Sequence, residues 1–249
     1  MDERIDELGI NNLKIIQNKK YFCFGIDSVL LANFVNSNNA NNIIVDLCSG
    51  SGVIPVIISA KKKYSKIFGV ELQKEMFDIL NRNIKINNLE ENIYGINLDI
   101  KEIKKIREKI GTITKKDKVD IIVCNPPYKK IGTGSKNENE IKYIARHEVM
   151  CDLEDIFRSS SKLLKSKGKL YLVHKPERIV DLLSISRKYH LEAKSIRFVC
   201  PNINSKPSIV LIEYVLGGKN ECIIEKPLIE YNLDGSYTDE ILNIYGIDK

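Results

Sequence analysis

The chain has 249 residues, and its 39 lysines and arginines against 33 aspartates and glutamates give a formal net charge of +6. Hydrophobic residues make up 43% of the chain, enough for a substantial core, so a disordered or fibrous protein is excluded. No apolar run approaches the roughly 20 residues of a membrane span, and the mixed charges at the N-terminus are unlike an export signal. We therefore expect one large α/β domain that stays in the cytoplasm and does not enter a membrane.

The predicted elements alternate along the chain between helices and strands. A first helix should run through residues 29–34, capped by Asp27 or Ser28, and apolar residues at three- and four-residue spacing predict another over 76–89. Seven β-branched runs predict strands at 43–47, 67–70, 93–98, 119–124, 169–173, 196–200 and 209–216. This alternation predicts a parallel sheet covered by helices on both faces.

The end of the chain departs from this pattern. Residues 201–207, between the last two predicted strands, are too few for a crossover helix, so these strands should pair antiparallel and make the sheet mixed. We divide the chain into a helical or extended lead-in (1–42), a core (43–217) and a C-terminal appendage packed on the core (218–249). Ser236 or Thr238 should start a short helix in the appendage.

The cysteines and histidines show no metal-binding pattern. No Cys-x-x-Cys occurs, and the three histidines lack ligand spacing relative to one another or to the cysteines, so we expect no metal. The six cysteines are interpreted as small hydrophobic residues of the interior. They are Cys23, Cys48, Cys124, Cys151, Cys200 and Cys222.

A glycine-containing turn between the first core strand and its helix is the first candidate binding site. It reads Asp46-Leu47-Cys48-Ser49-Gly50-Ser51-Gly52, and such a turn brings backbone N–H groups and a helix start close to a nucleotide-like ligand. The alternative is a tight turn without a ligand. Pro55 occupies the place of the third glycine of a dinucleotide fold, and the Asp46 carboxylate would repel a pyrophosphate. The zwitterionic end of S-adenosylmethionine fits better, with its ammonium at Asp46 and its carboxylate at the backbone of residues 50–52.

Acidic residues end the next two predicted strands. Glu71 follows Gly52 by 19 residues, where a carboxylate can accept both hydroxyls of a ribose. Asp99 could accept from an adenine amino group. Each has a structural alternative as a helix cap, Glu71 for the helix from Gln73 and Asp99 for one from Lys101.

The tetrapeptide Asn125-Pro126-Pro127-Tyr128 follows the apolar strand at 119–124. Two consecutive prolines fix the backbone and remove two N–H donors, so mainly hydrogen-bond acceptors face a ligand there. A planar NH₂ group could donate to the Asn125 side-chain oxygen and the Pro126 carbonyl, and stack on Tyr128. The alternative is a strand-ending turn with a surface tyrosine. Together with the glycine turn and Glu71, the tetrapeptide favours a site that acts on an amino group.

These motifs, in this order, resemble the class I S-adenosylmethionine-dependent methyltransferases that act on amino nitrogens, over about residues 40–217. The whole chain resembles the bacterial tRNA1(Val) adenine-37 N6-methyltransferase family, through residues 24–32, 145–148, 226–228 and 234–238. The resemblance implies a Rossmann-like, seven-stranded mixed sheet with an antiparallel last strand. One departure is Cys48, because family members more often carry glycine at that position.

The resemblance also implies roles for the site residues. Asn125 and Tyr128, with the two prolines, would hold the target base, and the product of the cofactor would be S-adenosylhomocysteine. The residues expected to bind the cofactor are Gly25, Asp27, Asp46, Cys48, Gly50, Gly52, Glu71, Leu72, Asp99, Ile100 and Asn125. The partner would be tRNA, and the protein would be a monomer or a weak dimer.

Lysines supply the electrostatic part of this expectation. They cluster at residues 61–63, 104–105, 115–116 and 129–130, where flexible ammonium groups could reach phosphates; an ordinary solvated surface is the alternative. The polar segment 129–146 is expected to be a mobile loop that contacts RNA or closes over the base.

Other functions remain open at this point. A release-factor glutamine N5-methyltransferase also acts on a planar NH₂, but its family adds an N-terminal helical domain, whereas only about 42 residues precede the first strand here. A DNA adenine or rRNA guanine methyltransferase, a catalytically silent RNA-binding module and an NAD-dependent oxidoreductase are the further alternatives.

Overall fold

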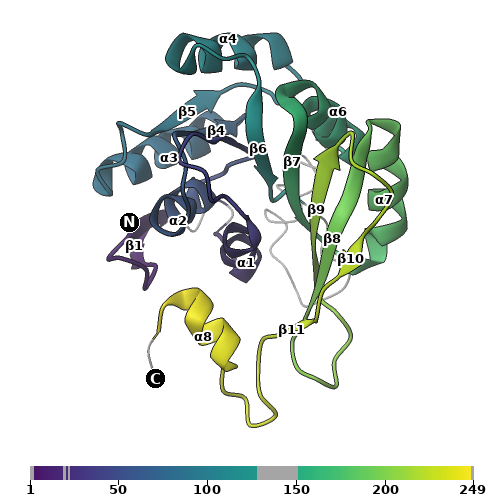
Figure 1. Cartoon of the computed structure of the whole chain (residues 1–249). Coiled ribbons are helices and arrows are strands. Elements are labelled where there is room, and N and C mark those ends of the chain that lie inside the picture. Colours follow the sequence, from purple (N-terminus) through teal and green to yellow (C-terminus); the bar gives the residue numbers. More distant parts are fainter. Residues whose placement is uncertain (1–2, 19–20, 22, 128–150, 248–249) are drawn as a thin grey trace.

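A mixed β-sheet runs through the centre of the molecule (Figure 1). The structure is a computed structural model that describes residues 3–18, 21, 23–127 and 151–247. The order of the strands in the sheet is β10-β8-β9-β7-β6-β3-β4-β5, and β11 also pairs with β8. The strands of this sheet are β3 (Ile43–Leu47), β4 (Lys66–Glu71), β5 (Ile93–Asn97), β6 (Val119–Cys124), β7 (Leu164–His174), β8 (Leu191–Cys200), β9 (Ile209–Leu216), β10 (Ile223–Ile224) and β11 (Leu228–Ile229).

The sheet confirms the predicted fold class. Strands β5, β4, β3, β6 and β7 are parallel neighbours, and β9 runs antiparallel to both β7 and β8. All seven predicted strands are present, and β7 and β8 begin five residues earlier than predicted, at Leu164 and Leu191 instead of 169 and 196. The sequence pattern missed these starts because Lys165 to Gly168 and Glu192 to Ser195 lack an apolar run.

Helices cover both faces of the sheet, as the alternation of elements predicts. One apolar core lies beneath α1, α2 and α3, and a second lies beneath α4, α6 and α7. Because both faces are buried, the central strands are continuous apolar runs and not alternating ones. The helices are α1 (Ile26–Phe34), α2 (Val53–Lys61), α3 (Lys74–Ile86), α4 (Ile103–Thr114), α6 (Leu153–Leu163), the 3-10 turn η1 (Pro176–Arg178), α7 (Ile179–Lys188) and α8 (Asp239–Tyr245).

The start of α1 corrects one prediction. Helix α1 begins at Ile26, and Gly25 in an extended conformation takes the N-cap position without a side-chain hydrogen bond. Asp27 and Ser28 therefore lie inside the first turn and do not cap the helix. The expected caps failed because glycine, which offers no side-chain acceptor, also serves as an N-cap residue.

The N-terminal lead-in contains an antiparallel hairpin that the sequence pattern did not predict. Strand β1 (Glu3–Glu7) pairs with β2 (Lys14–Asn18), and Asn83 of α3 joins this hairpin to the glycine turn. The Asn83 side chain is fully buried; its Oδ1 accepts from the Ile16 N–H at 2.7 Å and its Nδ2 donates to the Ser51 carbonyl at 2.9 Å. One side chain thus connects the lead-in, α3 and the turn between β3 and α2.

The C-terminal tail extends the sheet and packs on α1. Strands β10 and β11 both pair parallel with β8, and Ile241 of α8 is fully buried in the core that also holds α1. Thr238 caps α8 by accepting from the Ile241 N–H, which confirms one of the two predicted helix starts. The division into 1–42, 43–217 and 218–249 remains a prediction.

The cysteines differ in burial. All six are free thiols; Cys124 and Cys200 are buried, Cys23, Cys48 and Cys151 are half-buried, and Cys222 is exposed. The expectation of small interior residues is therefore wrong for Cys222, which lies in the tail just before β10. Within the described residues, no helix is both long and apolar enough to cross a membrane.

Candidate active site

The predicted site residues come together at the carboxyl ends of four neighbouring strands. Asp46, Glu71, Asp99 and Asn125 end or follow β3, β4, β5 and β6, and these strands are adjacent in the order β6-β3-β4-β5. Parallel strands present their carboxyl ends at one edge of the sheet, where open α/β sheets bind ligands. The strand order therefore brings the four side chains to the same edge.

The turn from β3 to α2 approaches β4 and α3 closely. Gly50 and Gly52 have φ values of +55° and +81°, in the left-handed region that glycine adopts without strain. On the neighbouring strand, a Cβ at Gly69 would lie 2.8 Å from Ser49 Oγ and 2.7 Å from Leu80 Cδ1. Gly69 is thus needed for the turn and α3 to pack against β4.

Two backbone donors of this turn already have partners. The Gly50 N–H donates to Glu71 Oε2 at 2.8 Å, and the Gly52 N–H donates to the Ser49 carbonyl at 2.9 Å. A ligand carboxylate would meet these N–H groups only by displacing those acceptors. The expectation that the backbone of residues 50–52 is open to a carboxylate is therefore not met at these two positions.

Asp46 is a buried carboxyl group with one unsatisfied oxygen. Its side chain is fully buried; Oδ2 accepts from Ser49 Oγ at 2.6 Å, whereas Oδ1 has no hydrogen-bond partner among the described residues. Burial raises the pKa of Asp46 to about 8, the Ser49 hydrogen bond opposes this rise, and the nearby Glu71 carboxylate adds to it. A buried acceptor without a donor is costly, so a ligand donor at Oδ1 would remove a penalty that the protein alone leaves in place.

Glu71 braces the glycine turn against the end of β4. Its side chain is buried, Oε2 accepts from the Gly50 N–H, and Oε1 accepts from the Gln73 N–H at 2.8 Å. Helix α3 begins one residue later, with Gln73 as an N-cap that makes no side-chain bond, so Glu71 does not cap it. Each carboxylate oxygen has a second lone pair, and both remain suitable acceptors for hydroxyl groups.

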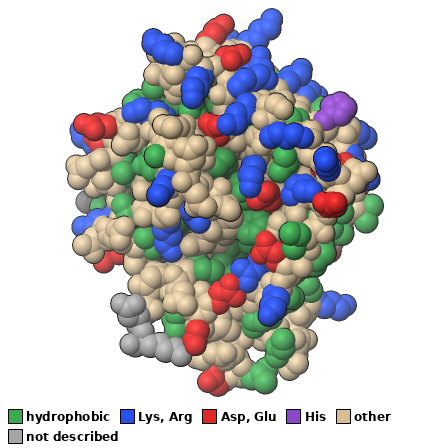
Figure 2. All heavy atoms as spheres, viewed as in Figure 1, with side chains coloured by type: hydrophobic (Ala, Val, Ile, Leu, Met, Phe, Trp, Pro, Cys, Tyr) green, Lys and Arg blue, Asp and Glu red, His purple; other side chains and the backbone are tan. Residues whose placement is uncertain are grey.

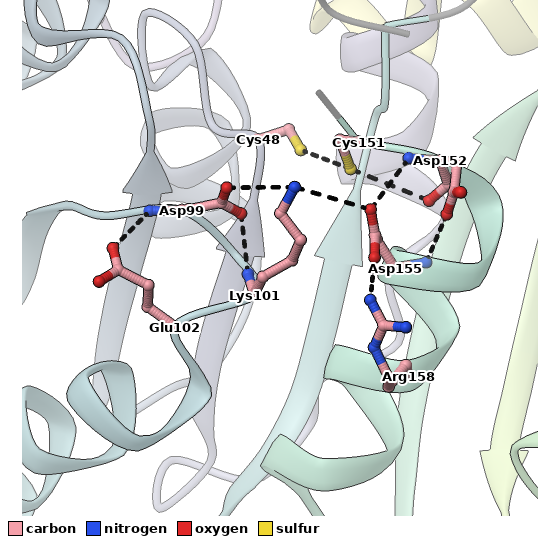
Figure 3. A network of polar contacts seen from close by, with 8 residues as sticks. All are labelled: Cys48, Asp99, Lys101, Glu102, Cys151, Asp152, Asp155 and Arg158. Atoms are coloured by element: carbon pink, nitrogen blue, oxygen red, sulfur yellow. Dashed lines mark hydrogen bonds and ion pairs between the residues drawn. The ribbon is translucent and has the colours of Figure 1, made fainter. Parts of the chain in front are cut away.

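Asp99 belongs to a polar network that crosses from β5 to the start of α6 (Figure 3). Its Oδ1 accepts from the Lys101 N–H at 2.9 Å, and the Lys101 ammonium lies 3.4 Å from Asp99 Oδ2 and 4.0 Å from Asp155 Oδ2. The following helix begins at Ile103, so Asp99 forms a local turn instead of capping a helix from Lys101. Nothing in the sequence pattern paired Lys101 with Asp155, because their contact depends on the packing of α6.

Cys48 occupies the glycine position of the turn and adopts the conformation of a glycine. Its φ is +60°, and its Sγ lies 3.9 Å from Cys151 Sγ in the network of Figure 3. Hydrogen bonding with Cys124 together with burial raises the pKa of the Cys48 thiol, so it stays neutral. The turn therefore keeps the glycine-like geometry with a side chain present, at the cost of an unfavourable backbone angle.

Asn125 follows β6 and faces helix α1. Its Nδ2 donates to Ser28 Oγ at 2.9 Å, and the Pro126 side chain next to it is buried. Since Pro126 and Pro127 carry no N–H, the chain after β6 offers carbonyl oxygens and the Asn125 side-chain oxygen at this edge. Tyr128, the segment 129–146 and the cluster at 129–130 lie outside the described residues, as does the 145–148 motif.

The remaining predicted cofactor residues differ in accessibility. Leu72, just beyond β4, is 37% exposed, whereas the Ile100 side chain is buried in the core beneath α4 and α6. Ile100 can therefore offer a ligand little besides its backbone. Gly25 and Asp27 lie at the start of α1. Among the described residues, no group of three or more His, Cys, Asp and Glu side chains is arranged to hold a metal ion.

Two predicted lysine clusters lie at the opposite edge of the sheet. Residues 61–63 lie between α2 and the start of β4, and residues 115–116 lie between α4 and the start of β6. Both places are at the amino ends of parallel strands, away from Asp46 and Asn125. In Figure 2, lysine and arginine side chains are densest in the upper part of the view, where Figure 1 shows α4.

The chain is similar to methyltransferases in sequence. A family model described as the TRM5/TYW2 methyltransferase domain matches residues 14–129. A relative named tRNA1(Val) (adenine(37)-N6)-methyltransferase from Porphyromonas gingivalis is 23% identical, over 76% of this chain and 73% of its own length. Another with the same name, from Shewanella woodyi, is 24% identical over 87% of each chain.

Solved structures share the fold. One described as a predicted O-methyltransferase from Agrobacterium tumefaciens superposes with a TM-score of 0.68 at 20% identity, over 88% of this chain and 95% of that chain. The TYW2 protein of M. jannaschii, in complex with AdoMet, superposes with a TM-score of 0.53 at 12% identity, over 86% and 85% of the two chains. Together, the family model, the relatives and the shared fold support a class I S-adenosylmethionine-dependent methyltransferase. As a methyltransferase of this class, it is an enzyme whose methyl donor is S-adenosylmethionine.

Proposed function

We propose that this methyltransferase methylates the N6 amino group of an adenine in tRNA, at position 37 of a valine tRNA. The observation that carries the proposal is the position of the Asn125 carboxamide. Asn125 directly follows β6 and precedes two prolines, and β6 pairs with β3, the strand that leads into the glycine turn. The names of the relatives from P. gingivalis and S. woodyi support tRNA as the substrate.

The residues at the sheet edge fit the cofactor. The buried Asp46 Oδ1, to which no described residue donates, suits the ammonium of the methionine part. Glu71 would accept the ribose hydroxyls, and Asp99 an adenine amino group. Gly25, Asp27, Cys48, Gly50, Gly52, Leu72 and Ile100 complete the proposed set.

The chemistry demands alignment more than activation. The sulfonium of S-adenosylmethionine supplies a methyl group that is already electrophilic. Asn125 Oδ1 and the Pro126 carbonyl accept from the exocyclic NH₂ of the target base, which holds the nitrogen in line and localises its lone pair. No nucleophilic side chain is required, and the surplus proton leaves the product nitrogen after transfer.

Tyr128 is proposed to stack on the target base. A base of the anticodon loop must leave its stack to enter the site, and an aromatic face returns part of the lost stacking energy. Tyr128 adjoins Pro127 in the sequence, which is why we assign it this role.

The test is a product analysis. The methyltransferase is incubated with labelled S-adenosylmethionine and unmodified tRNA, the RNA is digested to nucleosides, and the labelled nucleoside is identified. We expect N6-methyladenosine. Release factor protein, rRNA and DNA serve as parallel substrates; label in a glutamine of the release factor, or in another nucleic acid in place of tRNA, would contradict the proposal.

Asn125→Ala gives the matching prediction for the site. Loss of an acceptor used mainly in the transition state should reduce kcat by about a hundredfold while the cofactor affinity changes little. Single-turnover rates and S-adenosylhomocysteine titration measure the two quantities separately. A loss of cofactor affinity as large as the loss of rate would contradict the assigned role.

A further inference from the structure

Ser28 makes a hydrogen bond that its helix does not need. It lies in the first turn of α1, is 4% exposed, and its backbone N–H donates to the Gly25 carbonyl at 3.2 Å. Its Oγ accepts from Asn125 Nδ2 at 2.9 Å, across 97 residues of sequence. A serine within a helix commonly bonds a carbonyl of the preceding turn instead, so this contact connects α1 specifically to the end of β6.

The contact holds the Asn125 carboxamide against α1, with its oxygen facing outward. The amide nitrogen and oxygen lie on opposite sides of the terminal carbon, so a nitrogen held by Ser28 directs the oxygen away from α1. No other hydrogen bond to the Asn125 side chain is seen from the described residues. Pro126 and Pro127 have no N–H groups and cannot hold the Asn125 oxygen instead.

The direction of this amide decides whether it can bind an amine. With its oxygen outward, Asn125 accepts a hydrogen bond from a target NH₂. With the amide rotated by half a turn, two NH₂ groups would face each other, and neither could accept. The Ser28 hydroxyl can bond either end of the carboxamide, so Ser28 fixes where the carboxamide lies. The target NH₂ group selects the state with the oxygen outward, because only that state can accept from it.

We propose that Ser28 is a positioning residue for methyl transfer. By accepting from Asn125 Nδ2, its hydroxyl holds the carboxamide in place, so that Asn125 Oδ1 lies within reach of the target amine. This role rests on the proposed function, because it requires the substrate to present an NH₂ group.

The test compares Ser28→Ala with the same substitution at a buried serine of α7. Alanine is favourable in a helix, so the variant should fold, which a melting curve confirms. We expect kcat to fall about tenfold, the worth of one hydrogen bond between neutral groups, with the KM for S-adenosylmethionine within twofold of that of the unaltered chain. The control is Ser186→Ala in α7, where a similarly buried hydroxyl (1% exposed) donates to the Leu183 carbonyl of its own helix. Its kcat should not change.

A double-mutant cycle separates positioning from a general effect on structure. If Ser28 acts through Asn125, then adding Ser28→Ala to Asn125→Ala should lower kcat no further. A further tenfold fall in that background would overturn the inference, as would a Ser28→Ala enzyme with an unchanged kcat. No transfer to tRNA by the unaltered chain would overturn the proposed function and this inference together, whereas normal transfer with a silent Ser28→Ala would overturn the inference alone.

Discussion

Asp46 is a carboxyl group whose charge depends on its burial in the candidate site. Complete burial and the neighbouring Glu71 carboxylate raise its pKa from 3.8 to about 8, so it is mostly protonated at neutral pH in the protein without ligands. An ammonium placed at Oδ1 would favour the ionised form. Cofactor binding should therefore expel a proton from Asp46 wherever the pH lies below about 8.

The first prediction concerns the pH dependence of cofactor affinity. The affinity for S-adenosylhomocysteine should rise with pH, by up to about tenfold per unit from pH 6 to 8, and then level off. Calorimetry in two buffers of different ionisation enthalpy measures the affinity and the released proton together. In Asp46→Asn both effects should vanish. A pH-independent affinity of the unaltered chain over this range would contradict the ammonium site at Asp46.

The raised pKa of Asp46 also makes the stability of the fold depend on pH. Stability should fall as the pH rises, whereas the cofactor affinity should rise. From pH 3.8 to about 8 the folded chain keeps a proton that the unfolded chain releases, so this group destabilises the fold increasingly as the pH rises through that window. The buried carboxyl group therefore lowers the free energy of unfolding of the protein without ligands, and its main use comes when a ligand is bound.

Cys48 supplies the second prediction, at a position where glycine would be unstrained. With φ at +60°, Cys48→Gly should keep both the turn and the cofactor affinity. Cys48→Val should lower the free energy of unfolding by about 1–3 kcal/mol, because a β-branched side chain tolerates the left-handed region poorly. Urea denaturation of the two variants makes the comparison. Equal stability of the two would show that the turn can relax to another conformation.

At the level of elements, the sequence predicted the core well and the periphery poorly. All seven core strands and the antiparallel β9 were predictable because β-branched runs and a short link at 201–207 report local preferences. The hairpin β1–β2 could not be predicted from local preferences, because strand β2 is held by Asn83 and Asn87, which lie far along the chain. The contacts of Lys101 with Asp155 and of Ser28 with Asn125 were missed for the same reason, since packing alone brings these partners together. Asp46, Glu71 and Asn125 were identifiable because each lies at or directly after the carboxyl end of a predicted strand.

Helix α3 carries the third prediction, on the attachment of that hairpin. Asn83→Ala leaves the Ile16 N–H and the Ser51 carbonyl without their partner in a buried place, so the free energy of unfolding should fall by about 1–3 kcal/mol. Asn87→Ala is the matched control one turn later, because Asn87 bonds the backbone of Lys14 at the surface, where water can replace it. Urea midpoints give both values. A larger loss for Asn87→Ala would contradict the connecting role of Asn83.

In the whole molecule, the two ends of the sheet carry different features. The site lies at the carboxyl ends of the parallel strands, together with residues 201–207 and the tail that follows β9. Lysines at 61–63 and 115–116 lie at the amino ends. If tRNA enters the site, lysines on the carboxyl side should contribute more to its binding than these clusters do.

The fourth prediction tests this with two charge-matched variants. Lys206 and Lys226 are exposed near the carboxyl end of β8, and Lys115 and Lys116 are the matched pair at the other edge. Replacing the first pair by alanine should weaken tRNA binding severalfold and reduce the slope of log Kd against log salt by about 1–2; replacing the second should do neither. Filter binding at several salt concentrations gives both numbers. An effect confined to the second pair would contradict this prediction, because it would place the RNA at the amino ends of the parallel strands.

The pairing of β3 with β6 has a consequence for how such an enzyme changes its substrate. Leu47 lies opposite Cys124 in this ladder, so the turn after β3 and the acceptors after β6 are held at one fixed separation by backbone hydrogen bonds. Mutations in the tail can therefore accumulate without disturbing the separation between the turn after β3 and the acceptors after β6. Descendants of such a chain can acquire new targets while inheriting the same reaction geometry.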